Sequence, residues 1–157
     1  MRWTDVGQTV PELAATAEAM LTAHRHLTMA TVRADGSPRI SGTEVTLVNG
    51  DFYLAGMCGS RRFADLRRDP RVAVHCASAD PAQWIGDAKF GARAVEAFDP
   101  GQMTAFRTSR DHVPEGPFEL FVLDIEELTV TRLGEDRDHL VIETWHHTRG
   151  LLRVERR

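Results

Sequence analysis

The spacing of apolar residues changes early in the chain from a helical period to the alternation of strands. Residues 11–25 begin with Pro11, which suits the first turn of a helix, and predict a helix of that extent. Its common face carries Leu13, Ala17, Met20, Leu21 and His24. From residue 27 onward, short runs rich in Thr and Val alternate with turn residues and predict strands.

Turn residues divide the first strands sharply. The sequence Ala-Asp-Gly-Ser-Pro at 34–38 ends a strand over residues 27–33. The pair Asn49-Gly50 separates a strand over 39–48 from a returning strand at 51–55, and this pair is the strongest short hairpin signal. We expect these three strands to form an antiparallel meander.

The rest of the chain continues this pattern with only two short helices. The expected elements are a helix over 61–69 that Pro70 ends, strands over 71–77 and 87–98, a helix from 99, strands over 118–133 and 139–145, and a basic tail over 149–157. Six or seven strands with helices only at the crossings predict a mainly β fold, a small antiparallel split β-barrel. We expect a single domain over residues 1–157, with the barrel over about 27–147.

Composition narrows the class of protein. The chain has 157 residues, of which 42% are hydrophobic and 27% charged, and its net charge is −4. These values fit one soluble, cytoplasmic domain and argue against nucleic-acid and membrane partners. Two cysteines are too few for a disulfide framework or a zinc ribbon, and the histidine spacings match no helical ligand pair, so no metal site is expected.

Two segments could bind a ligand, although no catalytic signature is present and no catalytic residue is assigned. Gly59-Ser60-Arg61-Arg62 opens a helix, where a hydroxyl, free backbone N–H groups and two guanidiniums favour a phosphate. An ordinary Ser N-cap followed by solvated arginines would look the same. In residues 39–43, alternation places Arg39, Ser41 and Thr43 on one strand face, opposite Ile40. That face could line a polar planar ligand or be the wet side of a sheet.

Several segments together resemble the pyridoxamine 5′-phosphate oxidase-like flavin and deazaflavin oxidoreductases. They are GSPRIS at 36–41, FYLA at 52–55, GSRRFADLRRDPRVAV at 59–74, GARAVE at 91–96, and Thr-Trp at 144–145 with the arginines of 149–153. The resemblance covers about residues 25–155. It implies a split barrel that forms a homodimer, with a cofactor at the interface between protomers.

The resemblance also implies roles for individual residues. Ser60 and Arg61 would hold the phosphate of FMN, with Arg62 as a further contact. The implied neighbours of the flavin ring are Arg39, Ser41 and the backbone of Ile40, then Ala55 and Gly56 beneath the ring, and the partner subunit's Trp145 at its border. The vitamin-B6 oxidases carry a lysine where this chain has Glu44, which argues against pyridoxamine phosphate as the substrate.

The function that the resemblance implies is FMN-dependent oxidation or reduction of a small molecule, with hydride transfer through flavin N5. Two alternatives remain open within it. One is a reductase that uses the deazaflavin coenzyme F-420 instead of FMN. The other is a non-catalytic protein that holds a flavin, or a haem with His146 and His147 as candidate ligands. A degenerate member with an empty cofactor site is a further possibility, which Glu44 beside the phosphate loop keeps open.

Overall fold

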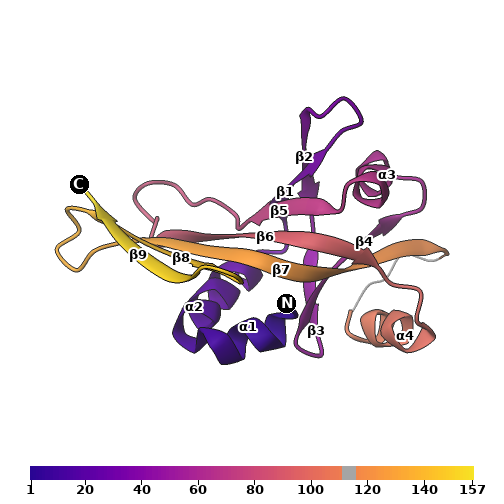
Figure 1. The fold of residues 1–157 in the computed structure, drawn as a ribbon, viewed down its shortest axis with the longest axis horizontal. Coiled ribbons are helices and arrows are strands. Elements are labelled where there is room, and N and C mark those ends of the chain that lie inside the picture. Colours follow the sequence, from indigo (N-terminus) through magenta and orange to yellow (C-terminus); the bar gives the residue numbers. More distant parts are fainter. Residues whose placement is uncertain (111–115) are drawn as a thin grey trace.

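The computed structural model describes residues 1–110 and 116–157, which form one antiparallel sheet with four helices packed around it (Figure 1). The helices are α1 (Trp3–Thr9), α2 (Pro11–Thr22), α3 (Arg61–Arg68) and α4 (Pro100–Thr108). The strands are β1 (Leu27–Val32), β2 (Pro38–Thr43), β3 (Val45–Val48), β4 (Asp51–Met57), β5 (Arg71–His75), β6 (Gly86–Glu96), β7 (Phe118–Leu133), β8 (Leu140–His146) and β9 (Gly150–Arg156). None of these helices is long and apolar enough to cross a membrane.

Seven strands follow one another across the sheet in the order β2-β1-β5-β6-β7-β4-β3. The two edge strands of this path, β2 and β3, are consecutive in the chain and only Glu44 lies between them. The sheet therefore curls until its edges are joined by one residue, while no ladder pairs those edges within the described residues. This arrangement confirms the predicted split β-barrel. β8 and β9 extend the sheet from the far end of β7.

The main core lies between the sheet and the N-terminal helices α1 and α2, which pack against one of its faces (Figure 1). At its centre the Phe52 ring lies 4.7 Å from Trp3 and 5.7 Å from Phe90, between centroids. The Trp3 indole donates a 2.6 Å hydrogen bond to Glu18 and so connects the two helices. A smaller cluster around Tyr53 packs α4 against the sheet.

The N-terminal region holds one helix more than the sequence predicts. The expected helix starts at Pro11 and is α2, but α1 precedes it and the chain turns between them at Val10, whose φ is −136° and ψ 67°. α1 is held by the burial of Trp3 and Val6, which are one turn apart. Two apolar positions in seven residues are too few to show a helical period, so the sequence pattern missed this helix.

The hairpin at Asn49-Gly50 is confirmed, but the meander is wrong. Both residues have positive φ, 50° and 83°, as the twist of a two-residue hairpin requires. The strand predicted over 39–48 breaks at Glu44 into β2 and β3. As a result β2 pairs with β1 at one edge of the sheet, while β3 and β4 form the other edge, where β4 pairs with β7.

The predicted basic tail is also wrong, because most of it forms β9. Gly150, with a φ of +77°, reverses the chain after β8. Arg153 then lies opposite Glu143 in the strand register and pairs with Glu155 of its own strand at 3.0 Å. The split at Glu44 and this last strand account for nine strands where seven were expected.

Candidate functional site

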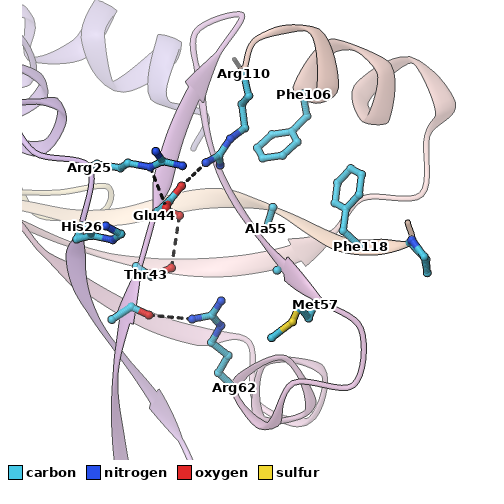
Figure 2. Close-up of a pocket in the computed structure, with 13 residues that line it drawn as sticks. Arg25, His26, Thr43, Glu44, Ala55, Met57, Arg62, Phe106, Arg110 and Phe118 are labelled. Carbon is cyan, nitrogen blue, oxygen red and sulfur yellow. Dashed lines mark hydrogen bonds and ion pairs between the residues drawn. The ribbon is translucent and has the colours of Figure 1, made fainter. Parts of the chain in front are cut away.

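A cavity of about 480 Å³ opens beside the joint between β2 and β3 (Figure 2). The strands β2 and β4 supply its floor, α3 one end, and the end of α4 with the start of β7 the aromatic side. Its lining residues are Arg25, His26, Gly42, Thr43, Glu44, Ala55, Gly56, Met57, Arg62, Phe106, Arg110, Pro117 and Phe118. Three guanidiniums and one carboxylate are among them, so the cavity is basic although the whole chain is acidic.

The N-terminus of α3 stands at one end of this cavity and holds unused hydrogen-bonding groups. Gly59 turns the chain with a φ of +75°, and Ser60 takes the extended N-cap conformation. The Ser60 hydroxyl makes no capping bond, and it is buried without a partner among the described residues. The Nε atom of Arg62 is likewise buried without a hydrogen-bond partner among the described residues. Unpaired buried donors at a helix N-terminus fit an anionic ligand such as a phosphate.

Arg62 is held tightly in position along β2 and β4. Its Nη1 donates to the Gly42 carbonyl at 2.8 Å, and its guanidinium carbon lies 5.2 Å from the Phe63 ring centroid. A Cβ on Gly56 would lie 2.8 Å from Arg62 Nη2, so the glycine leaves the room that the guanidinium occupies. Burial lowers the pKa of Arg62, but an arginine keeps its charge at neutral pH.

The opposite end of the cavity carries an ion-pair cluster around Glu44 (Figure 2). Arg25 donates to Glu44 at 3.0 Å, Arg110 bonds the other carboxylate oxygen, and Arg110 also donates to Thr46 at 3.1 Å. Burial alone would raise the pKa of Glu44, but the two arginines outweigh it and the pKa lies below its ordinary value. Glu44 is therefore a resident anion that ties β2, β3 and the end of α4 together.

The predicted residues on β2 behave differently from those on β4 and α3. Arg39 and Ser41 lie on the more buried face of β2, and Ile40 is 75% exposed on the other, as alternation predicted. However, Arg39 donates a 2.6 Å hydrogen bond to buried Asp65, and none of the three lines the cavity. The next residues of the strand, from Gly42 onward, line it instead.

Asp65 explains why Arg39 is turned away from the cavity. This α3 carboxylate is 4% exposed and also accepts from Thr31 at 3.0 Å. Burial favours the neutral acid, yet hydrogen bonds from Arg39, Thr31 and Arg68 outweigh it and lower the pKa of Asp65. The network fastens α3 to β1 and β2.

The remaining predicted residues divide into those near the cavity and one far from it. Ala55, Gly56 and Arg62 line it, and Ser60 with exposed Arg61 flanks it at the start of α3. Trp145 is 2% exposed and packs within the main core. It lies on β8 opposite Leu128, away from the cavity, and would have to leave the core to touch a ligand of a second protomer.

Sequence reasoning missed the cluster at Glu44 and the aromatic side of the cavity. Arg110 is 66 residues from Glu44 along the chain. The apolar spacing of α4 predicts that Phe106 is buried, but not that it lines a cavity. No local pattern links such distant positions. The one signal was Glu44 itself, an acidic residue inside the strand predicted over 39–48. We expected it beside the phosphate loop, but it pairs with Arg25 and Arg110 at the other end of the cavity.

Comparison with known proteins gives a family and a fold. Residues 13–132 match the sequence family described as pyridoxamine 5′-phosphate oxidase. No curated protein matches the chain by sequence.

Among solved structures, PhzG from Burkholderia lata, in complex with tetrahydrophenazine-1-carboxylic acid, superposes with a TM-score of 0.63 at 11% identity, over 96% of this chain and 91% of that one. A haem-binding protein from Mycobacterium smegmatis gives 0.60 at 15% identity, over 90% and 87%. An F420 reductase gives 0.55 at 16% identity, over 71% and 94%. These likenesses share the fold and differ in what the proteins bind.

Proposed function

The chain belongs to the pyridoxamine 5′-phosphate oxidase family, and on this premise we propose that it is an FMN-dependent oxidoreductase acting on a small molecule. Bound FMN supplies hydride transfer at N5. The protein's part is to bind the cofactor, orient it and shape the space in which a substrate meets it.

The observation that carries this proposal is the unpartnered hydroxyl of Ser60 beside Arg62 at the start of α3. The first N–H groups of a helix have no partner within the helix, and they form the positive end of its dipole. A terminal phosphate would satisfy these N–H groups and the Ser60 hydroxyl, and Arg61 and Arg62 would balance its charge. These residues therefore fit the phosphate of FMN.

The rest of the cavity fits a flat ring and a second ligand. Ala55 and Gly56 present a surface without long side chains next to Arg62. Phe106 and Phe118, whose ring centroids are 5.7 Å apart, form an aromatic wall on the other side. We assign the first surface to the flavin and the wall to the substrate. Arg39, Ile40 and Ser41 do not line the cavity, so in this proposal they lie behind the residues that contact the flavin. Trp145 would contact the flavin only after leaving the core.

The absorption spectrum of the purified protein, with mass analysis of what heat releases, tests the proposal. Oxidised-flavin bands and released FMN support it, and they call for a test of reduction by a nicotinamide and reoxidation by an acceptor. Replacing Ser60 and Arg61 together by alanine should then weaken FMN binding. Unchanged FMN affinity in this variant would show that the phosphate binds elsewhere. A Soret band would point to haem and to His146 and His147.

A deazaflavin reductase is the second candidate, and Arg25 favours it. This side chain is 62% exposed at the Glu44 end of the basic cavity, where an acidic extension of a longer cofactor could reach it. A colourless protein should be titrated with FMN and with coenzyme F-420 separately. Binding of F-420 alone would replace the leading proposal by this one, and binding of neither would leave a degenerate site.

The functional unit in this proposal is a homodimer with the cofactor near the interface. Support comes from the outer face of β2, where Ile40 is 75% exposed next to the small residues Ala30 and Ala73 of neighbouring strands. An exposed apolar patch of this kind is typical of a face that a second subunit covers.

A further inference from the structure

Glu119 lies behind the loop that leads into α3 and touches that loop directly. It sits at the start of β7, opposite Gly56 of β4. Its Oε1 accepts the Gly59 N–H at 3.1 Å and lies 3.1 Å from Arg67 Nη2. The side chain is 14% exposed, so solvent competes little for these bonds.

Arg67 fixes the Glu119 carboxylate in turn. It lies in the last turn of α3 and donates to both carboxylate oxygens of Glu96 on β6. Its guanidinium carbon is 5.6 Å from the centroid of the Phe121 ring. Glu96 and then Glu119 raise the pKa of Arg67 above its ordinary value. The loop residue Gly59 is thus connected through Glu119 to β7 and α3, and through Arg67 and Glu96 to β6.

The contact matters because of where it lies in the loop. Gly59 is the residue with positive φ just before the N-cap, so its orientation sets where the Ser60 hydroxyl and the first N–H groups of α3 point. Donation to Glu119 removes the Gly59 N–H from the groups that could reach an anion. It leaves that task to Ser60, Arg61 and Arg62.

We propose that Glu119 is the positioning residue of the phosphate-binding loop, holding Gly59 so that the start of α3 faces the phosphate group of the cofactor. The inference rests on the proposed function, since it concerns the same phosphate. Glu119 acts through Gly59 and does not itself contact the phosphate.

The chain offers a matched control in Glu96. Glu96 and Glu119 both pair with Arg67, but only Glu119 reaches Gly59. A general weakening of the ion-pair network would follow from either substitution. A specific effect on the loop would follow only from Glu119.

The test compares the affinities of FMN and riboflavin, which differ only by the phosphate, in the wild type and in Glu119→Ala, Glu119→Gln and Glu96→Ala. We expect Glu119→Ala to weaken FMN binding about tenfold, the factor of one charge-assisted hydrogen bond, and to leave riboflavin unchanged. Glu119→Gln keeps an acceptor for the Gly59 N–H and should restore most of the preference for FMN. Glu96→Ala should keep the wild-type ratio.

The Gly59 amide gives a readout without any cofactor. Its hydrogen exchange, followed by NMR, should accelerate in Glu119→Ala and not in Glu96→Ala. The inference is overturned if Glu119→Ala retains the wild-type FMN-to-riboflavin ratio, or if Glu96→Ala lowers that ratio equally. A wild type that binds both flavins equally, or neither, would instead overturn the proposed function.

Discussion

The contacts that hold individual side chains in place in this protein come from residues far away in the sequence. Strand alternation places Arg39 on the correct face of β2, but not beside its partner Asp65, which is 26 residues away. In the same way the motif at Ser60 and Arg61 identifies the start of α3, while Glu119 follows 60 residues after Gly59. Local patterns predict the face and the element; the pairing depends on the fold.

Asp65→Asn should lower the free energy of unfolding by about 2 kcal/mol, because it removes one charge from a buried pair and leaves Arg39 without its counter-ion. The folded pKa of Asp65 is below its ordinary value of 3.8, so this stabilisation is present above pH 3.8 and is lost as the pH falls through the folded pKa. Urea denaturation of both proteins as a function of pH measures it. The difference should stay constant near neutrality and close in acid; a constant difference at every pH would contradict the assignment.

Gly56→Ala tests the packing of the cavity floor. The new Cβ would meet Arg62 Nη2 at 2.8 Å and the Phe63 ring at 3.1 Å, so we expect a loss of about 1–3 kcal/mol in stability and weaker FMN binding. Gly7→Ala in α1 is the control, since nothing lies within 4 Å of its Cβ and Gly7 does not line the cavity. Equal effects of the two substitutions in thermal unfolding and flavin titration would show that Arg62 has room to move.

Elements whose ends carry strong local signals are those that the sequence predicts well. β7 has the predicted bounds, and α3 begins after Ser60 and ends near Pro70 as expected. The failures are at α1, at Glu44 and at β9. In each case burial or pairing with a distant strand decides the structure, and local propensity does not reveal it.

The β3–β4 hairpin allows backbone strain to be separated from steric conflict. Gly50 and Gly36 both have a φ of +83°, but a Cβ on Gly50 would lie 2.3 Å from Thr4 Oγ1 and one on Gly36 would meet nothing within 4 Å. Gly36→Ala should therefore cost about 1 kcal/mol, and Gly50→Ala clearly more. The excess should shrink when Gly50→Ala is made together with Thr4→Ala, in a double-mutant cycle of unfolding free energies. An excess that survives in the double variant would place the conflict elsewhere.

At the scale of the whole molecule, an acidic chain encloses a basic cavity and exposes the apolar side chain of Ile40 on the outer face of β2. The fold class follows from alternation and turns alone. The cavity does not, because its walls come from segments as distant as Arg25 and Phe118. The exposure of Ile40 is likewise a property of the assembled sheet.

Ile40→Glu should prevent dimer formation if the outer face of β2 is the interface, because a carboxylate would be buried there without a partner. Ile85→Glu is the matched control: Ile85 is equally exposed, at 75%, but lies in the loop before β6. Light scattering after size exclusion should give a monomer for the first variant and a dimer for the second and the wild type. A dimeric Ile40→Glu variant would assign the interface to another surface.

The position of β7 in the sheet has a consequence for how the protein is made. Residues 118–133 are the common neighbour of β4, β6 and β8, so both earlier strands lack a partner along one edge until this segment exists. On a ribosome, more than three quarters of the chain must emerge before the barrel can close. Until β7 has emerged, the apolar strands of the nascent polypeptide are exposed to solvent, and chains in this state aggregate easily. Biogenesis of this protein should therefore depend on translation speed and on chaperones that shield unfinished sheets.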